Sequence, residues 1–571
     1  MLIKLQRTFF IIWLLVIFIV AILFWYSPVL FKGYPAQNID SEGVITTARN
    51  YSQYNILGSE SDLNVVVAPS LVKSLANKTS LGNKLSIFGY AAIFKLFGQL
   101  TWDQVAIISL ILHALALVFF SITIFYLFGL EVSIIFSLIY ILLPINWQTA
   151  YFIGSYEFAL LFLSLFTVLF FSFRNYKYKW PFLILAGIFL ALAGLAREAL
   201  FLSFPVILIW LWFNKKIKET ILIFAPVILL LAVFWLPNFL NGSSDYFKLF
   251  VTNNSQEKSS ADFHFYSHIY PDPYTYYFDN QSILNPTPDN INGNNSGWLY
   301  KIGRLKSEAN LGLKQVNIFE RLVVGTTNLA RQISKYLSLE DIGGPLIFML
   351  MLIGLYQLKN KNRGIYFLFI SLLIAIPLIL SYVVLGRRSH LMDFSWIIAS
   401  LVAIGLVSLK PLLRDYYQVT KYLKVIYLMV IILVLYNLVL ADHVYWSKAY
   451  DSTKYLEIKY LADKVNNYPT KIDDSNVIAV ANSGLHPSLN YLSNKSVVLF
   501  NPVTIAKLIN NGGLQKAFDD FGVNYIIGYD QELSKSIIKN SDVINISNWP
   551  DKQDLQIPLN YNKSWLLNLV K

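Results

Sequence analysis

Several ionisable side chains of this chain lie at the ends of long apolar segments. Glu157 lies within the start of one such segment, in GSYEFALLF, and Arg197 and Glu198 are the only charges between two others. Removing a charge from water is costly unless it is paired or faces a wet cavity. Glu157 is therefore predicted to be functional or paired. Arg197 and Glu198 either satisfy each other at the membrane interface or serve a site there.

Two acidic residues, Asp40 and Glu42, follow the first apolar segment in NIDSEGVITTARNY. Residues 44–51 have helical spacing, so one interpretation makes Asp40 a helix cap and Glu42 a favourable first-turn charge. The other interpretation is catalytic, because a positioned carboxylate can take the proton of a hydroxyl nucleophile. A capping carboxylate can also be catalytic, and both interpretations stay open.

A basic group, Arg387, Arg388 and His390, precedes a late apolar segment. Lipid headgroups would account for these charges, but the planar fork of a guanidinium also suits a bound phosphate. Together with Arg197 they are candidates for a phosphate site.

The segment ADFHFYSHIYPDPYTYY offers other chemistry. Its potential metal ligands are Asp262, His264, His268 and Asp272. Their spacing fits no specific template, so no metal site is predicted. Tyr274 and Tyr276 could stack on sugar rings, although interface anchoring is the commoner use of such tyrosines. The chain has no cysteine, which excludes disulfides and cysteine-ligated metals.

The elements that position these residues are apolar. Hydrophobic residues make up 56% of the chain and charged residues 14%, whereas a soluble domain carries about a quarter charged residues. The apolar runs are 9–30, 103–128, 131–146, 155–173, 181–196, 199–213, 219–237, 343–357, 365–385, 391–409 and 424–441. They predict an all-α polytopic membrane protein with about eleven spans. The first run lacks a small-residue cleavage site and is predicted to be an uncleaved span.

Basic residues in alternate connections predict the orientation. One set of connections contains Lys4, Arg7, Arg174, Lys177, Lys179, Lys215, Lys216, Lys218, Lys359, Lys361, Arg363, Lys410, Arg414, Lys421 and Lys424. The opposite short connections contain only Arg197, Arg387 and Arg388. The positive-inside rule then places the N-terminus in the cytoplasm. The net charge of +12 is explained by this pattern, and no nucleic-acid partner is predicted.

This orientation places every long soluble segment outside. Residues 1–441 are predicted to form the membrane domain, with outer loops at about 32–102 and 238–342. Residues 442–571 are predicted to form a small extracytoplasmic α/β domain. Its expected strands are Val477–Ala481, Ser496–Phe500 and Val523–Gly528, and its expected helices lie at 453–466 and across 503–521. Residues 318–337 are amphipathic and predict a helix on the outer interface.

Taken in order, these features resemble the C-superfamily (GT-C) membrane glycosyltransferases. The closest likeness is to bacterial relatives of the protein O-mannosyltransferases and of the lipid A aminoarabinose transferase. The segments that carry it are DSEGVITTARNY, YAAIFKLFG, GSYEFALLF, GLAREALFLSFP and GRRSHLMDFSWIIASLVAIGL. Two features depart from the family pattern: Ser41 separates the acidic pair, and the usual Pro-rich stretch before the second span is missing.

The resemblance implies transfer of a sugar from a polyprenyl-phosphate donor in the cell membrane to an acceptor hydroxyl of a protein, lipid or glycan, with inversion. It implies no cofactor beyond the lipid-linked sugar. The catalytic candidates are Asp40, Glu42 and Glu157, with Asp40 the first choice for the base. The phosphate-binding candidates are Arg197, Arg387, Arg388 and His390. The acceptor-side candidates are Glu198, Tyr274 and Tyr276.

Three other functions compete with this one. A transporter or flippase for lipid-linked sugars would be expected to have charges in the middle of its spans and internal repeats. In this chain the notable charges lie at the ends of spans on one side of the membrane, and no repeat is found. A non-catalytic envelope assembly protein needs no convergent acids and arginines. A polymerase or ligase of surface polysaccharides uses similar lipid-phosphate chemistry and stays open as an alternative.

Overall fold

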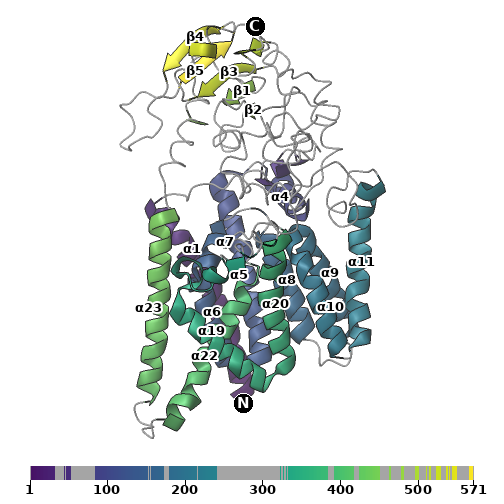
Figure 1. Cartoon of the computed structure of the whole chain (residues 1–571), viewed down its shortest axis with the longest axis vertical. Coiled ribbons are helices and arrows are strands. Elements are labelled where there is room, and N and C mark those ends of the chain that lie inside the picture. The colour runs from purple at the N-terminus through teal and green to yellow at the C-terminus, as the bar shows by residue number, and fades with distance from the viewer. Residues whose placement is uncertain are drawn as a thin grey trace.

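A computed structural model of the chain provides the structure. It describes residues 2–32, 44–45, 47–49, 51–52, 84–98, 100–151, 154, 156–172, 179–214, 216–240, 322, 326, 329–330, 332–383, 391, 393–416, 423–449, 462–463, 477–480, 496–499, 509–510, 514–515, 523–528, 535–537, 539, 543–548 and 565–569. Helices stand side by side in a bundle, and a small sheet lies beyond one end of it (Figure 1).

Each predicted apolar run coincides with a helix. These helices are α1 (Leu2–Lys32), α5 (Trp102–Phe128), α6 (Leu130–Leu142), α8 (Tyr156–Ser172), α9 (Trp180–Ala196), α10 (Ser203–Phe213), α11 (Ile217–Leu240), α19 (Pro345–Lys361), α20 (Arg363–Val383), α22 (Ser395–Tyr416) and α23 (Leu423–Ala449). Shorter elements are α4 (Lys84–Phe97), α7 (Pro144–Tyr151), η2 (Glu198–Leu202) and α18 (Leu339–Ile342). Helices dominate because the bilayer leaves backbone groups no other partners.

Four of the helices are long and apolar enough to cross a membrane by themselves, namely α1, α5, α11 and α23. The protein is therefore a helical membrane protein. Shorter apolar helices include α6, α8, α9 and α10. The total of about eleven spans and the orientation stay predictions. Helix α23 continues through Ala449, so the predicted boundary between residues 441 and 442 falls inside a helix.

Close backbone contact joins α19 to α22. A Cβ atom added at Gly354 would lie 1.9 Å from the carbonyl oxygen of Leu401, and one at Gly405 would lie 2.2 Å from that of Leu350. Lipid offers no hydrophobic drive for helix association, so close packing across small residues has to hold such pairs together. This contact helps to fix α22. The residue Asp393, just before α22, contributes to the site described below.

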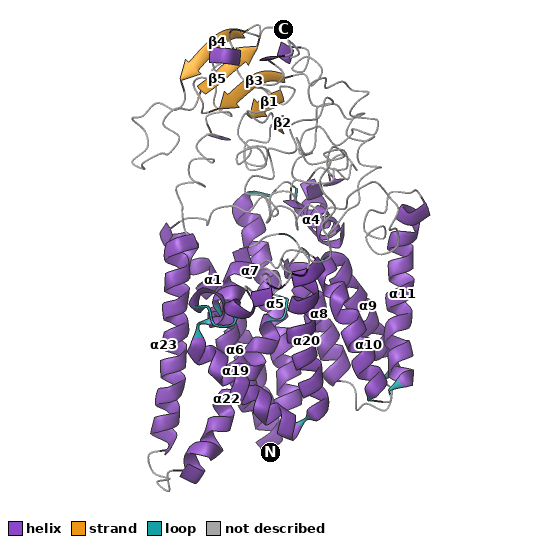
Figure 2. Ribbon diagram, in the orientation of Figure 1, coloured by secondary structure: helices purple, strands orange, loops and turns teal. Residues whose placement is uncertain are grey.

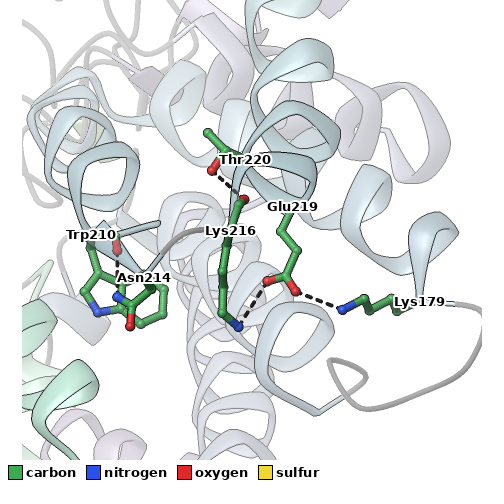
Figure 3. A network of polar contacts seen from close by, with 6 residues as sticks. All are labelled: Lys179, Trp210, Asn214, Lys216, Glu219 and Thr220. Atoms are coloured by element: carbon green, nitrogen blue, oxygen red, sulfur yellow. Dashed lines mark hydrogen bonds and ion pairs between the residues drawn. The ribbon is translucent and has the colours of Figure 1, made fainter. Parts of the chain in front are cut away.

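A cluster of ionic side chains joins the beginnings of α9 and α11 (Figure 3). The Lys179 ammonium donates a hydrogen bond to Glu219 Oε1 at 2.8 Å, and Lys216 Nζ lies 3.3 Å from Glu219 Oε2. Asn214 and Thr220 bond within their own turns, to the carbonyl oxygens of Trp210 and Lys216. We call Lys179, Lys216 and Glu219 the lysine cluster.

The C-terminal strands form one mixed sheet (Figure 2). They are β1 (Val477–Val480), β2 (Ser496–Leu499), β3 (Val523–Gly528), β4 (Val543–Asn548) and β5 (Trp565–Leu569), in the order β2-β1-β3-β5-β4. Strand β1 pairs in parallel with β2 and β3, and β5 pairs antiparallel with β3 and β4. The three predicted strands are present, and β4 and β5 were not predicted. Within the predicted helices, residues 462–463, 509–510 and 514–515 are described and are helical.

The described residues between 322 and 335 are helical, as predicted for the interfacial segment. The side chains of Leu322, Ile333 and Leu337 on its apolar face are exposed. At its end, the hydroxyl of Tyr336 donates to the carbonyl oxygen of Leu373 on α20, at 3.1 Å. A position on the membrane interface stays a prediction.

Candidate functional site

The candidate site begins where α9 ends. Arg197 follows α9 with an extended backbone, and its amide still donates to the carbonyl oxygen of Ala193 at 3.0 Å. The short helix η2 starts immediately afterwards. This break places the long side chain of Arg197 at a helix end, inside the bundle, where it is 8% exposed.

Arg197 pairs with Asp393, a residue 196 positions away in the sequence. Its Nε donates to Asp393 Oδ2 at 2.8 Å and lies 2.7 Å from Oδ1. The Asp393 side chain is 1% exposed. The residue lies in the chain just before the first turn of α22. The pair satisfies two charges that the bundle interior would otherwise destabilise strongly.

An aromatic ring covers the same guanidinium. The central carbon of the Arg197 guanidinium lies 3.7 Å from the centre of the Tyr156 ring, at the start of α8. A cation over an aromatic face is attracted by the ring quadrupole, and more so where water is excluded. Three helix ends thus hold one guanidinium: the end of α9 and the beginnings of α8 and α22.

Glu157 is fully buried beside this group. Its Oε1 accepts a hydrogen bond from the Ser109 hydroxyl of α5 at 2.7 Å, and its Oε2 accepts one from the Gly154 amide at 3.1 Å. It lies in the first turn of α8, where the helix dipole favours a negative charge. Its sequence neighbour Tyr156 is the residue whose ring covers the Arg197 guanidinium. We call Tyr156, Glu157, Arg197 and Asp393 the arginine cluster.

More buried polar atoms lie near this cluster, from α5, α6 and α22. The ring nitrogens of His113 and the indole nitrogen of Trp396 have no hydrogen-bond partner among the described residues. The rings of His113 and Tyr140 have centroids 5.7 Å apart, and Tyr140 faces Ser395. Buried polar atoms without a protein partner usually bind ordered water or mark a binding site. The interior here is polar.

An apolar cavity of about 20 Å³ lies between the helices α8, α10, α20 and α22. Its lining includes Phe394 and Trp396, which come one and three residues after Asp393 in the chain. Such a space accommodates only a group of about the size of one water molecule. The chain that follows Asp393 therefore lines an apolar space.

The structure brings together two predicted residues, Glu157 and Arg197. The backbone of Glu198 lies in η2. The other candidates lie outside the described residues, namely Asp40, Glu42, Asp262, His264, His268, Asp272, Tyr274, Tyr276, Arg387, Arg388 and His390, together with the side chain of Glu198.

Sequence reasoning missed Asp393 and Tyr156. Asp393 lies in GRRSHLMDFSW, the segment in which Arg387, Arg388 and His390 are predicted to bind phosphate. The rule that selected Glu157, an ionisable group at the mouth of an apolar run, applies equally to Asp393 and would have found it. Nothing in the sequence distinguishes Tyr156 from the chain's other tyrosines.

This chain resembles known proteins in its structure rather than in its sequence. No model of a protein family and no curated protein matches the sequence. Among solved structures, the oligosaccharyltransferase AglB of Archaeoglobus fulgidus, with an inhibitory peptide and a dolichol-phosphate, gives a TM-score of 0.51 at 13% identity. That match covers 96% of this chain and 75% of AglB. ArnT of Cupriavidus metallidurans, bound to undecaprenyl phosphate, gives a TM-score of 0.52 at 9% identity, covering 97% of both chains.

The chain therefore shares its fold with AglB and ArnT. The resemblance found in the order of the sequence segments is thereby confirmed at the level of the fold. At these identities the likeness extends no further than the fold. The assignment of roles to residues therefore depends on the geometry of the arginine cluster.

Proposed function

We propose that this protein is a glycosyltransferase that moves a sugar from a polyprenyl-phosphate donor to an acceptor hydroxyl at the outer face of the membrane. The observation that carries the proposal is the arginine cluster. A guanidinium is buried, ion-paired and stacked within a bundle of this fold, next to a buried carboxylate. The fold's occurrence in AglB and ArnT, solved with dolichol-phosphate and undecaprenyl phosphate, supports the choice of donor.

The chemistry requires stabilisation of a departing phosphate. When the acceptor oxygen attacks the anomeric carbon, the bond to the lipid phosphate breaks and negative charge develops on the phosphate oxygens. Donors that are already fixed in place stabilise such charge without reorganising during the reaction. Arg197, held by Asp393 and Tyr156, is proposed to serve in this way, with Arg387, Arg388 and His390 adding to the phosphate site.

The acceptor proton requires a base. A hydroxyl is a weak nucleophile near neutral pH, so a carboxylate has to take its proton as the new bond forms. Asp40 is the proposed base, with Glu42 or Glu157 orienting the acceptor. Glu198, Tyr274 and Tyr276 are proposed on the acceptor side. Direct displacement by this route inverts the configuration at the anomeric carbon.

The test uses purified protein in lipid with labelled polyprenyl-phosphate sugars, measuring transfer and donor hydrolysis. We expect Asp40→Asn to abolish turnover because the acceptor loses its base, while expression and donor binding stay close to wild type. Asp62→Asn, a second acid in the same loop, is the matched control and should retain turnover. Wild-type rates in Asp40→Asn would remove Asp40 from the mechanism. Absence of turnover with every donor in the wild-type protein would count against the proposed function itself.

A further inference from the structure

Asp393 is less exposed than Arg197, its partner in the ion pair. It lies in the turn before α22, so the first backbone amides of that 22-residue helix favour its negative charge. Helix α22 is itself fixed against α19 at the glycine contact through Gly354 and Gly405. The carboxylate is therefore held from its own side by a well-packed helix.

Arg197, in contrast, has a long side chain with many rotamers. Fixing such a side chain costs rotamer entropy. Two contacts counter this freedom from different directions. Asp393 accepts from Nε at the inner end of the guanidinium, and Tyr156 covers one face of its plane at 3.7 Å.

The charge of Asp393 works against phosphate binding. A carboxylate beside the guanidinium lowers the local positive potential, so it would repel an anion that approaches Arg197. A residue that served donor affinity alone would therefore be better neutral. The geometry favours another role, which is to keep the guanidinium in one place when charge develops on the phosphate.

We infer that Asp393 is a positioning residue for Arg197, holding its guanidinium where the departing lipid phosphate develops charge. This inference rests on the proposed function. It assigns Asp393 an effect on the rate of the chemical step, because misplacing a group that stabilises the transition state lowers kcat without lowering ground-state affinity.

The test separates rate from affinity in Asp393→Asn, which keeps the size of the side chain and removes its charge. Binding is measured with undecaprenyl phosphate on protein in nanodiscs, and kcat with labelled polyprenyl-phosphate sugars. We expect kcat to fall about 10- to 100-fold, with undecaprenyl phosphate bound as tightly as by wild type or more tightly. Arg197→Gln should weaken the binding of undecaprenyl phosphate, and this loss of affinity distinguishes it from Asp393→Asn.

Glu219→Gln is the matched control, since it neutralises another ion-paired carboxylate, one that is held by two lysines near the other end of α9. Its kcat and binding should equal those of wild type. If Asp393→Asn does not fold, Asp393→Glu takes its place, because it keeps the charge but lengthens the side chain, and it should also show lower kcat with unchanged binding.

Two results would overturn the inference. One is wild-type kcat in a folded Asp393 variant. The other is loss of undecaprenyl phosphate binding equal to that of Arg197→Gln, which would reduce Asp393 to a structural partner. Failure of the wild-type protein to bind undecaprenyl phosphate would instead reject the proposed function, together with the role that the inference assigns to Asp393.

Discussion

Helix α9 has an ionic cluster at each end, and the two clusters are built differently. At its beginning, Lys179 and Lys216 flank Glu219, with side-chain exposures of 40%, 17% and 11%. At its end, the side chains of Arg197 and Asp393 are 10% and 1% exposed. The lysine cluster uses flexible, partly solvated ammonium groups, whereas the arginine cluster fixes one planar guanidinium away from water.

The sequence separations of the partners differ as well. Glu219 bonds residues 40 and 3 positions away, within neighbouring helices and connections. Asp393 and Arg197 are 196 positions apart. A local cluster of lysines around one acid links the beginnings of α9 and α11 and lies in connections predicted to be cytoplasmic. A buried pair that needs distant helices to meet is weak evidence for stability, and so it invites a functional explanation.

The largest difference should come from Arg197→Gln compared with Lys179→Gln. Loss of one preorganised donor to a developing oxyanion lowers kcat by about 100- to 1,000-fold. The variant also leaves Asp393 buried without its partner, which costs about 3–5 kcal/mol of unfolding free energy. Lys179→Gln should change neither quantity appreciably, because its ammonium is partly exposed.

The measurements are transfer kinetics and denaturant unfolding in the same detergent. The double variant Arg197→Gln with Asp393→Asn removes both buried charges, so it should regain stability and stay inactive. Regained activity in the double variant, or equal losses in Arg197→Gln and Lys179→Gln, would break the contrast between the two clusters.

A smaller effect is expected from Glu157→Gln. The neutral amide cannot accept from both Ser109 and Gly154 as the carboxylate does, which costs about 1.5–3 kcal/mol for hydrogen bonds to a charged group. If Glu157 also orients the acceptor, transfer should fall at saturating donor. The control is Ser164→Ala on the same helix, where the lost hydroxyl bonds only the carbonyl oxygen of Leu161.

Unfolding free energy and transfer rate are measured in both variants. A destabilised Glu157→Gln with wild-type transfer would leave Glu157 as a link between α5 and α8. Unchanged stability would contradict the hydrogen bonds themselves.

The helices were predictable from the sequence because membrane helices are specified locally. An apolar run in a bilayer has to satisfy its own backbone groups, so composition alone predicts where α1 or α5 lies. Strands β1 to β3 were predictable as short β-branched runs. Strand β4, with the sequence VINISN, contains three polar residues, and strand β5, with the sequence WLLNL, is a short Leu-rich run that suits a helix as well as a strand. Their pairing in the sheet decides their state.

The candidate site was only partly predictable. Glu157 and Arg197 were found because charges at the ends of apolar segments need a reason to be there. That Arg197 meets Asp393 and Tyr156 depends on how α8, α9 and α22 pack together, and no local pattern encodes this contact. The partner that the sequence suggested for Arg197 was its neighbour Glu198, whereas its buried ion-pair partner comes from a distant helix.

The smallest effect should come from Glu219→Gln, and its dependence on salt sharpens the comparison. Partly exposed ion pairs contribute about 0–1 kcal/mol, so unfolding free energy should change little at low salt and not at all at high salt. The effect of Asp393→Asn on stability should persist at high salt, because a buried pair is screened far less. Unfolding at two ionic strengths tests both. Equal salt dependence in the two variants would mean that water reaches the Arg197–Asp393 pair as freely as the lysine cluster, and the guanidinium would then lack the dry surroundings on which its proposed role depends.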